Sequence, residues 1–433
     1  MTLGVSASMN APHDFASVSA SGPHQGPDTE SSNAVSSNTA SGTASGAARD
    51  TSHASDPSAI AAAGTPAAGA QAAGAQAAGS AVAGAAAGAP LAAAASAQAA
   101  FPLTPLPRPG RDEFDAALAR GAYMPLTQFG VIDVTGDDAA AFLHSQLTND
   151  TQHLDAASAR LAGYCTAKGR LLASFLTWRA GDAIRLLVSR DVQAAVQKRL
   201  SMFVLRAKAK LADASGALAV VGLAGDVRGA LSGVFDALPD GVHVKVDGPA
   251  GSLIRVPDAA GRLRYLWIGP KAQVEAHLPA LDAKLARASA AVWDWLDIRA
   301  GEPRITQRVA EQFVPQMINF DVLGGVNFRK GCYPGQEVVA RSQYRGTIKR
   351  RTALANVAGE PETVLAGSEL FHSDDPSQPC GMVVNAAAAP DGGVDMLVEI
   401  KLVALENGTV HLGGGEGPAL AFLPLPYALP SDA

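Results

Sequence analysis

The stretch Lys330-Gly331-Cys332-Tyr333-Pro334-Gly335-Gln336-Glu337 holds one of only three cysteines in a chain of 433 residues. Cys332 follows two cations, Arg329 and Lys330, and precedes a turn-forming Pro334-Gly335 pair and a helix-compatible run. Cationic neighbours and a nearby helix N-terminus both favour the thiolate form of a cysteine. We therefore predict that Cys332 is a functional thiol supported by Lys330, although the default role of a free cysteine is that of a small buried apolar residue.

The catalytic partner of Cys332 is not evident, because no histidine lies in its segment and His144 and His153 are distant in sequence. A redox, sulfur-handling or cluster-contacting thiol is favoured over an acyl-transfer nucleophile. The other cysteines, Cys165 and Cys380, form no CxxC or zinc pattern with it. We expect no metal site and a reducing, cytoplasmic compartment.

The first hundred residues are rich in Ala, Gly, Ser, Thr and Pro and nearly lack large apolar side chains. Such a composition buries too little surface to offset chain entropy, so residues 1–105 are predicted to be disordered. The Ala-rich run Ala81–Ala100 lacks the Leu, Ile and Phe content that favours membrane insertion. The first cation is Arg49, which argues against a secretory signal or an Arg-rich transit peptide. We expect no membrane association.

The rest of the chain predicts an α+β fold of two fused antiparallel-sheet and helix lobes, followed by a small β-barrel. The core spans 106–348, with one lobe at about 120–212 plus 289–348 and the other at 213–288, and the barrel spans 349–433. Period-2 and period-3.6 patterns of apolar residues define the elements of the two lobes. The predicted strands are 129–134, 161–164, 171–178, 184–188, 205–211, 218–223, 242–246, 252–256 and 263–268. The predicted helices are 139–147, 192–203, 226–238, 270–288 and 288–300.

The net charge is −6, and five acidic residues against one basic residue fall in the first hundred positions. The body is therefore close to neutral, which gives no global argument for nucleic acid or anionic membrane. One segment, Arg299–Arg351, carries ten basic residues against four acidic ones. It suits a polyanion such as a polyglutamate tail or RNA phosphate, or is simply a solvated face.

A flat heterocycle needs an aromatic wall and a few polar anchors. Trp293 is either a core residue of its helix or such a wall, with Arg299, Glu302 or Glu337 as anchors. The polar clusters Gln146–Asp150 and Lys168–Arg170 are either ordinary turns or, for Asn149 and Asp150, groups that point into a cavity.

Several motifs in a fixed order resemble the YgfZ branch of the folate-binding, aminomethyltransferase-like proteins. The resemblance runs from about Tyr123 to Tyr427, outside the N-terminal tail. It rests on the stretches 134–138, 146–150, 167–169, 298–301, 313–316, 323–325, 330–340, 345–346 and 425–427.

The resemblance implies a ring-like, three-lobed body around a central channel that binds tetrahydrofolate. It further implies an accessory protein that supports assembly or maintenance of iron–sulfur clusters and thereby tRNA thiolation, with tRNA contacted indirectly. The expected partners are folate and iron–sulfur assembly or cluster-containing proteins. Two tryptophans mark the folate site of such proteins. Trp293 matches one of them, and Phe129 replaces the other, so we predict Phe129, Trp293, Arg299 and Glu337 as folate-binding residues.

The alternative is a folate-dependent enzyme that transfers an aminomethyl or methyl group. Related transferases carry an aspartate pair after a turn that here reads Lys168–Arg170, and the matching positions are Ala173 and Ser174. Neither side chain can support a reactive folate nitrogen electrostatically. We therefore predict folate binding without aminomethyl transfer. Direct RNA binding through the basic segment is a third hypothesis, unsupported by any recognised RNA-binding motif.

Overall fold

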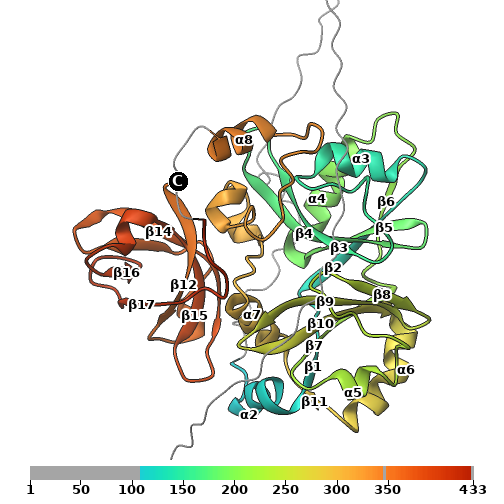
Figure 1. The fold of residues 1–433 in the computed structure, drawn as a ribbon. Coiled ribbons are helices and arrows are strands. Elements are labelled where there is room, and N and C mark those ends of the chain that lie inside the picture. Colours follow the sequence, from blue (N-terminus) through green and yellow to red (C-terminus); the bar gives the residue numbers. More distant parts are fainter. Residues whose placement is uncertain (1–107, 345–347, 431–433) are drawn as a thin grey trace, which may run out of the picture. The chain divides into compact units, whose positions relative to one another are not determined.

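The computed structural model describes residues 108–344 and 348–430 (Figure 1). The predicted disordered tail and the run Ala81–Ala100 lie outside the described residues. Within the described ranges, no helix is both long enough and apolar enough to cross a membrane. Three sheets organise this part of the chain.

The first sheet has the strand order β3-β4-β5-β2-β6, and every pair is antiparallel. Its strands are β2 (Phe129–Thr135), β3 (Ala159–Cys165), β4 (Leu171–Ala180), β5 (Ala183–Ser189) and β6 (Lys210–Asp213). Ile184, Leu186 and Val188 pack on helices α3 (Ala139–Gln146) and α4 (Arg190–Met202), whereas Leu187 faces the opposite way into a central core. Both faces are buried, which explains the nearly continuous apolar run of β4.

The second sheet has the order β11-β1-β7-β10-β9-β8 and is antiparallel except for the β1–β11 pair. Its strands are β1 (Ala122–Pro125), β7 (Leu218–Ala224), β8 (Lys245–Gly248), β9 (Gly251–Ala259), β10 (Arg262–Pro270) and β11 (Ala286–Arg287). Tyr265 and Trp267 on one face pack against α5 (Arg228–Leu231) and α6 (Lys271–Asp282). Leu266, between them in sequence, faces the central core.

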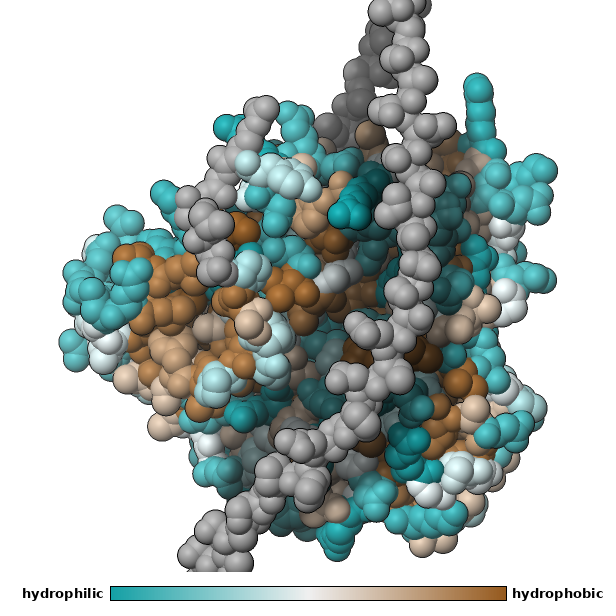
Figure 2. Space-filling model, in the orientation of Figure 1, coloured by the Kyte–Doolittle hydropathy of each residue, from teal (hydrophilic) through white to brown (hydrophobic). Residues whose placement is uncertain are grey.

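The third sheet is antiparallel, with the order β16-β13-β14-β15-β12-β17. Its strands are β12 (Arg350–Val357), β13 (Glu369–His372), β14 (Asp375–Ala388), β15 (Val394–Lys401), β16 (Val410–Leu412) and β17 (Leu420–Leu423). Leu370, Val383 and Val398 belong to its own apolar core. Large apolar side chains such as Leu405 and Phe422 remain exposed on this part of the molecule, where Figure 2 shows hydrophobic surface.

Helix α7 (Ala290–Arg299) contributes to the apolar cluster that joins all three sheets. Its Trp293 and Trp295, two residues apart, point in different directions. The Trp295 indole donates to Asp395 on β15 at 2.8 Å, whereas Trp293 packs against Gly222 on β7. The remaining short elements are α2 (Arg111–Asp115), η1 (Ala116–Arg120), η2 (Gln307–Val309), η3 (Pro315–Ile318), α8 (Gln336–Tyr344), η4 (Pro361–Thr363) and η5 (Leu402–Leu405).

The predicted strand 205–211 is wrong over most of its length. Leu205 has φ 45° and is 86% exposed, so the chain turns there instead of extending. Strand pairing with β2 begins only at Lys210, because Ala207 and Ala209 add little apolar area to the alternating pattern.

Two predicted helices are shorter than the sequence pattern indicates. The helix 226–238 reduces to α5, because Gly229 and Gly233 weaken it and Pro239 cannot continue it. The helix 270–288 ends at Asp282, and the chain then enters β11. Strand β1 was not predicted. It pairs with β7, which belongs to the predicted lobe 213–288. The predicted α+β class, with two antiparallel-sheet and helix lobes and a C-terminal β-structure, is nevertheless confirmed.

Candidate functional site

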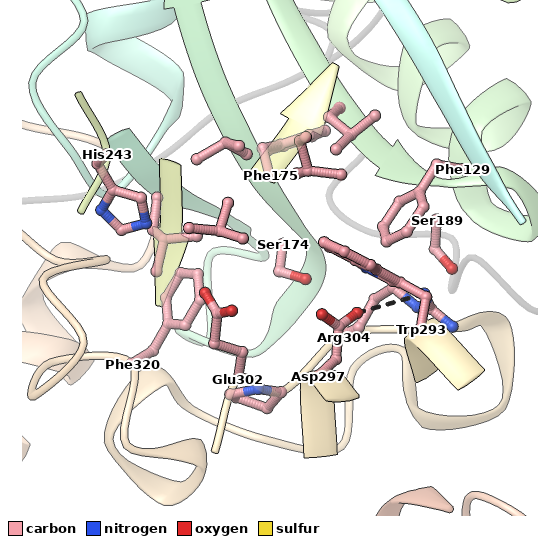
Figure 3. Close-up of a pocket in the computed structure, with 16 residues that line it drawn as sticks. Phe129, Ser174, Phe175, Ser189, His243, Trp293, Asp297, Glu302, Arg304 and Phe320 are labelled. Carbon is pink, nitrogen blue, oxygen red and sulfur yellow. Dashed lines mark ion pairs between the residues drawn. The ribbon is translucent and has the colours of Figure 1, made fainter. Parts of the chain in front are cut away.

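A pocket of about 580 Å³, including its opening to solvent, lies among side chains of the first two sheets, α7 and the segment that follows α7 (Figure 3). Apolar and aromatic residues dominate its lining, with a small set of polar groups. The lining comprises Phe129, Leu161, Ser174, Phe175, Leu176, Leu187, Ser189, His243, Val256, Leu266, Trp293, Asp297, Glu302, Pro303, Arg304 and Phe320. This mixture is typical of a small-molecule site.

Two aromatic rings, Phe129 and Trp293, lie at one end of the pocket (Figure 3). Trp293 is 1% exposed, and the Arg264 guanidinium lies 4.8 Å from the centre of its ring. The Arg304 guanidinium lies 4.7 Å from the centre of the Phe129 ring. Both rings are thus held by cation–π contacts, which restrict their orientation.

Two carboxyl groups, Asp297 and Glu302, enter the pocket and share one fully buried cation. Arg264 contacts Asp297 at 2.7 Å and Glu302 at 2.5 Å. Burial raises the pKa of Asp297 to about 7, against the opposing effect of Arg264. Burial also raises the pKa of Glu302. Arg304 lies farther from Asp297, at 3.9 Å, so two largely buried acids depend mainly on Arg264. The pair therefore retains a proton more readily than exposed carboxylates do.

His243 lies at the other end of the pocket, beside Phe320 (Figure 3). Its backbone has φ 62°, a conformation that is uncommon outside glycine, and burial lowers its pKa to about 4. Its Nε2 has no hydrogen-bond partner in the described part of the chain, and the same holds for Nε and Nη1 of Arg304. Buried polar atoms without partners are costly, so these atoms are available to a ligand.

Sequence reasoning found Phe129, Trp293 and Glu302 but missed three titratable residues of the pocket. Asp297 follows Trp293 by four residues on a helix, and this spacing places both on one face. Arg304 was visible only as a member of the basic segment. The sequence did not indicate a pocket role for His243, because a strand was predicted there.

The other two predicted folate-binding residues lie elsewhere. Arg299 directs Nη1 toward Asp395 on β15, at 3.5 Å. Glu337 is exposed near the start of α8 and has no ion pair or hydrogen bond among the described residues. Neither residue lines the pocket.

Cys332 is exposed, and it does not line the pocket with Phe129 and Trp293. The preceding Lys330 is buried and donates to the carbonyl oxygens of His144, at 2.6 Å, and Gly331, at 3.1 Å. Burial lowers the pKa of Lys330 to about 8, although Asp150 and Cys332 oppose the shift. The structure therefore places the cysteine segment against the end of α3.

The other two cysteines are buried and free. Burial raises the pKa of the Cys165 thiol to about 12, which makes it a poor nucleophile at neutral pH. In the described part of the chain, no three His, Cys, Asp or Glu side chains form a group that could hold a metal ion.

Four of the nine described basic residues of the basic segment pair with carboxylates. Arg304 contacts Asp294 at 2.9 Å, and Arg299 contacts Asp395. Arg350 contacts Glu399 at 2.7 Å and Arg351 contacts Asp321 at 2.6 Å. The basic residues without an ion pair in the described ranges are the exposed Arg308, Arg329, Arg341 and Lys349, and the buried Lys330. Arg345 lies outside the described residues.

The polar cluster Gln146–Asp150 has a structural use. Thr148 donates to Gly325 at 2.6 Å, and Asn149 donates to Gly324 at 2.7 Å. These bonds attach the loop after η3 to the end of α3. Asn149 and Asp150 do not line the pocket.

The three-sheet fold is that of an aminomethyltransferase T protein. The solved structure of the glycine cleavage system aminomethyltransferase T from Bartonella henselae matches 73% of this chain and 88% of its own, with a TM-score of 0.60 and 17% identity. At that identity the match concerns the fold alone. No family model matches the sequence.

Proteins that are similar in sequence define the family of this chain more narrowly than the fold does. The tRNA-modifying protein YgfZ of Edwardsiella ictaluri is 32% identical over 315 residues, which are 71% of this chain and 94% of that protein. The tRNA-modifying protein YgfZ of Serratia proteamaculans is 30% identical over 318 residues, which are 72% of this chain and 95% of that protein. The chain belongs to the YgfZ family.

Proposed function

We propose that this protein binds reduced folate and acts as an accessory factor in tRNA modification. In this proposal it supports the assembly or maintenance of iron–sulfur clusters on which tRNA thiolation depends. The relatives are named as tRNA-modifying proteins, and a folate-binding role is consistent with the aminomethyltransferase T fold. The observation that carries the folate proposal is the pocket with aromatic walls and two largely buried carboxyl groups.

The lining residues suit tetrahydrofolate. A pterin ring is flat and carries hydrogen-bond donors on one edge, which calls for aromatic contact and acceptor oxygens. Phe129 and Trp293 supply the contact, and Glu302 and Asp297 supply the acceptors. Buried Nε of Arg304 and Nε2 of His243, both without partners in the described part of the chain, add polar contacts for the ligand.

Each residue then has a defined task. Tetrahydrofolate, when bound, supplies a carrier for one-carbon groups. Trp293 and Phe129 hold its ring and exclude water. Arg264 fixes the two carboxyl groups at 2.7 and 2.5 Å. Cys332, outside the pocket, acts on a partner protein instead of on the folate ring.

The second candidate is a folate-dependent aminomethyl- or methyl-transferring enzyme. Its support is Asp297, whose pKa is raised to about 7 by burial, so that it exchanges protons near neutral pH. Against it stands Ser174, at one of the two positions where the transferases have aspartates. Its hydroxyl accepts a hydrogen bond from the Ile305 amide at 3.0 Å.

We predict no formation of 5,10-methylene-tetrahydrofolate from a lipoyl-bound aminomethyl donor. The assay uses the purified full-length chain, with an authentic aminomethyltransferase as the positive control. Product formation above background by this chain would establish the enzyme instead of the accessory factor.

Two tryptophans of α7 provide a matched test of folate binding. Trp293→Phe removes part of the pocket wall, so we expect binding of tetrahydrofolate to weaken about ten-fold, which corresponds to about 1.4 kcal/mol. Trp295→Phe loses a hydrogen bond to Asp395 outside the pocket and leaves affinity unchanged. Anaerobic isothermal titration calorimetry measures both. Equal affinity of the two variants would contradict the assignment of the pocket.

The proposed cellular compartment is the cytoplasm, and the proposed partners are proteins. The free thiols fit a reducing cytoplasm. Contact with tRNA is indirect in this proposal, because four arginines of the basic segment already pair with carboxylates. The partners are iron–sulfur assembly proteins or the cluster-containing enzymes themselves.

A further inference from the structure

A second group of titratable side chains lies outside the pocket, at the end of α3. Asp150 accepts a hydrogen bond from Nδ1 of His144 at 2.9 Å through Oδ1, and from Nδ1 of His153 at 2.8 Å through Oδ2. The backbone amides of Gln152 and His153 donate to Oδ1 at 2.9 and 3.0 Å. Partial burial opposes ionisation, but the hydrogen bonds from His153 and the nearby His144 lower the pKa of Asp150 to about 2. Asp150 is therefore an anion that fixes the orientation of the His144 ring.

The free edge of that ring faces the cysteine segment. A Cβ atom built on Gly331 would lie 3.6 Å from Nε2 of His144. Gly331 directly precedes Cys332, and Lys330 fastens the same segment to the His144 carbonyl oxygen at 2.6 Å. Nε2 of His144 makes no hydrogen bond among the described residues, while Nδ1 is held by Asp150. The fold thus brings an oriented imidazole, 16% exposed, next to Gly331, the residue that directly precedes an exposed thiol 188 positions away in the sequence.

We propose that Cys332, His144 and Asp150 form a nucleophilic thiol site that attacks a sulfur–sulfur bond presented by a partner. This proposal does not rest on folate binding or on the role in tRNA modification. The arrangement is the nucleophile, base and orienting group that thiol catalysis requires. Sulfur is the electrophile that a thiolate attacks most readily, and the cations Arg329 and Lys330 favour an anionic leaving thiolate.

The step is balanced within the site and its partner. His144 Nε2 takes the proton of the Cys332 thiol, and Asp150 stabilises the resulting imidazolium. The thiolate forms a bond to one sulfur of the partner while the sulfur–sulfur bond breaks. The leaving sulfur carries away the electron pair and takes the proton back from His144. Because Cys165 and Cys380 are buried, the thiol that later releases the adduct comes from the partner.

Several charged groups surround this site, and they set its pH dependence together. Arg160 on β3 donates to the carbonyl oxygens of Asp150, at 2.7 Å, and His153, at 2.8 Å. The charged or titratable side chains to consider are Arg329 and Lys330 in the cysteine segment, Asp150, His153 and Arg160 beside α3, and Glu337 near the start of α8.

The first test is the rate of Cys332 alkylation by iodoacetamide as a function of pH. The full-length protein is used, and the modified Cys332 peptide is quantified by mass spectrometry. We expect His144→Gln to slow alkylation at pH 7 by about ten-fold or more and to move the rate profile to higher pH, with Asp150→Asn acting in the same direction. His277→Gln is the control, since His277 lies on α6 and contacts Gln273 and Trp267 instead of Asp150, and it leaves the profile unchanged.

The second test uses two sulfur–sulfur probes, oxidised glutathione and glutathione persulfide. Faster reaction of wild type than of His144→Gln with either probe supports the proposal, and the reacting probe identifies the electrophile as a disulfide or a persulfide. Circular dichroism and the thermal midpoint confirm that each variant is folded. If wild type and His144→Gln have the same alkylation profile, or if neither probe reacts faster with wild type, the proposal is overturned.

Discussion

At the scale of single residues, the least expected feature is the sharing of one cation by two largely buried carboxyl groups. Arg264 is fully buried and contacts both Asp297 and Glu302. The sequence predicts a strand at Arg264 but does not indicate that two carboxyl groups contact its guanidinium. Burial raises the pKa of both carboxyl groups, so the pair can hold a proton that exposed carboxylates would release.

This pair makes the stability of the fold pH-dependent. The pKa of Asp297 is raised by burial to about 7, above the value of about 3.9 for an unfolded aspartate. The folded state therefore binds more protons than the unfolded state between these values, so stability is highest below about pH 4 with respect to this group and declines as pH rises toward 7.

We predict that the free energy of unfolding of Asp297→Asn declines less with rising pH than that of the wild type. The difference is about 1.4 kcal/mol for each unit by which folding raises the pKa of Asp297. The free energy of unfolding is measured in urea at several pH values between 4 and 8. Asp294→Asn is the control, since Asp294 pairs with Arg304 at 2.9 Å and is not bonded to Arg264. An unchanged pH slope in Asp297→Asn would show that this carboxyl group titrates as an ordinary aspartate.

At the scale of elements, helix α7 sets the geometry of the pocket. It presents Trp293 and Asp297 to the pocket and Trp295 to Asp395 on β15. The ring of Trp293 fits because β7 has a glycine beneath it. A Cβ atom on Gly222 would lie 2.3 Å from Cε3 of Trp293.

Gly222→Ala therefore displaces the Trp293 ring or the strand. We expect a loss of about 1–3 kcal/mol in the free energy of unfolding, together with weaker binding of tetrahydrofolate. Gly229→Ala on α5 is the matched control, because no atom lies within 4 Å of its added Cβ, and a helical alanine is favourable. Wild-type stability and affinity in Gly222→Ala would mean that Trp293 is not confined as described.

Elements with strong periodic patterns were predictable from sequence, and those that depend on distant contacts were not. The apolar stripe of Val192, Val196 and Leu200 predicted α4 correctly. The strand predicted from the alternation between Leu205 and Leu211 is wrong over most of its length. Its alanines follow the alternating pattern of a strand but are too small to supply the packing. The aromatic walls of the pocket, Phe129 and Trp293, came from the resemblance to the YgfZ-type proteins. His243 and Arg304 reach the pocket only through tertiary contacts, which a single sequence does not encode locally.

At the scale of the whole molecule, the pocket and the cysteine segment involve different residues. None of the described residues 330–337 lines the pocket, whereas Lys330 contacts α3. We therefore expect Cys332→Ala to bind tetrahydrofolate with wild-type affinity, as measured by the same calorimetry. A loss of affinity of about ten-fold or more in that variant would mean that the thiol and the folate site act as one unit.

The central claim is that the protein supports tRNA thiolation and that Cys332 is its working thiol. The most direct measurement quantifies thiolated tRNA bases by mass spectrometry after deletion of the gene and its restoration as wild type, Cys332→Ala or Cys380→Ala. We predict that deletion lowers the thiolated bases, that wild type and Cys380→Ala restore them, and that Cys332→Ala does not. Unchanged thiolation after deletion, or full restoration by Cys332→Ala, would contradict the claim.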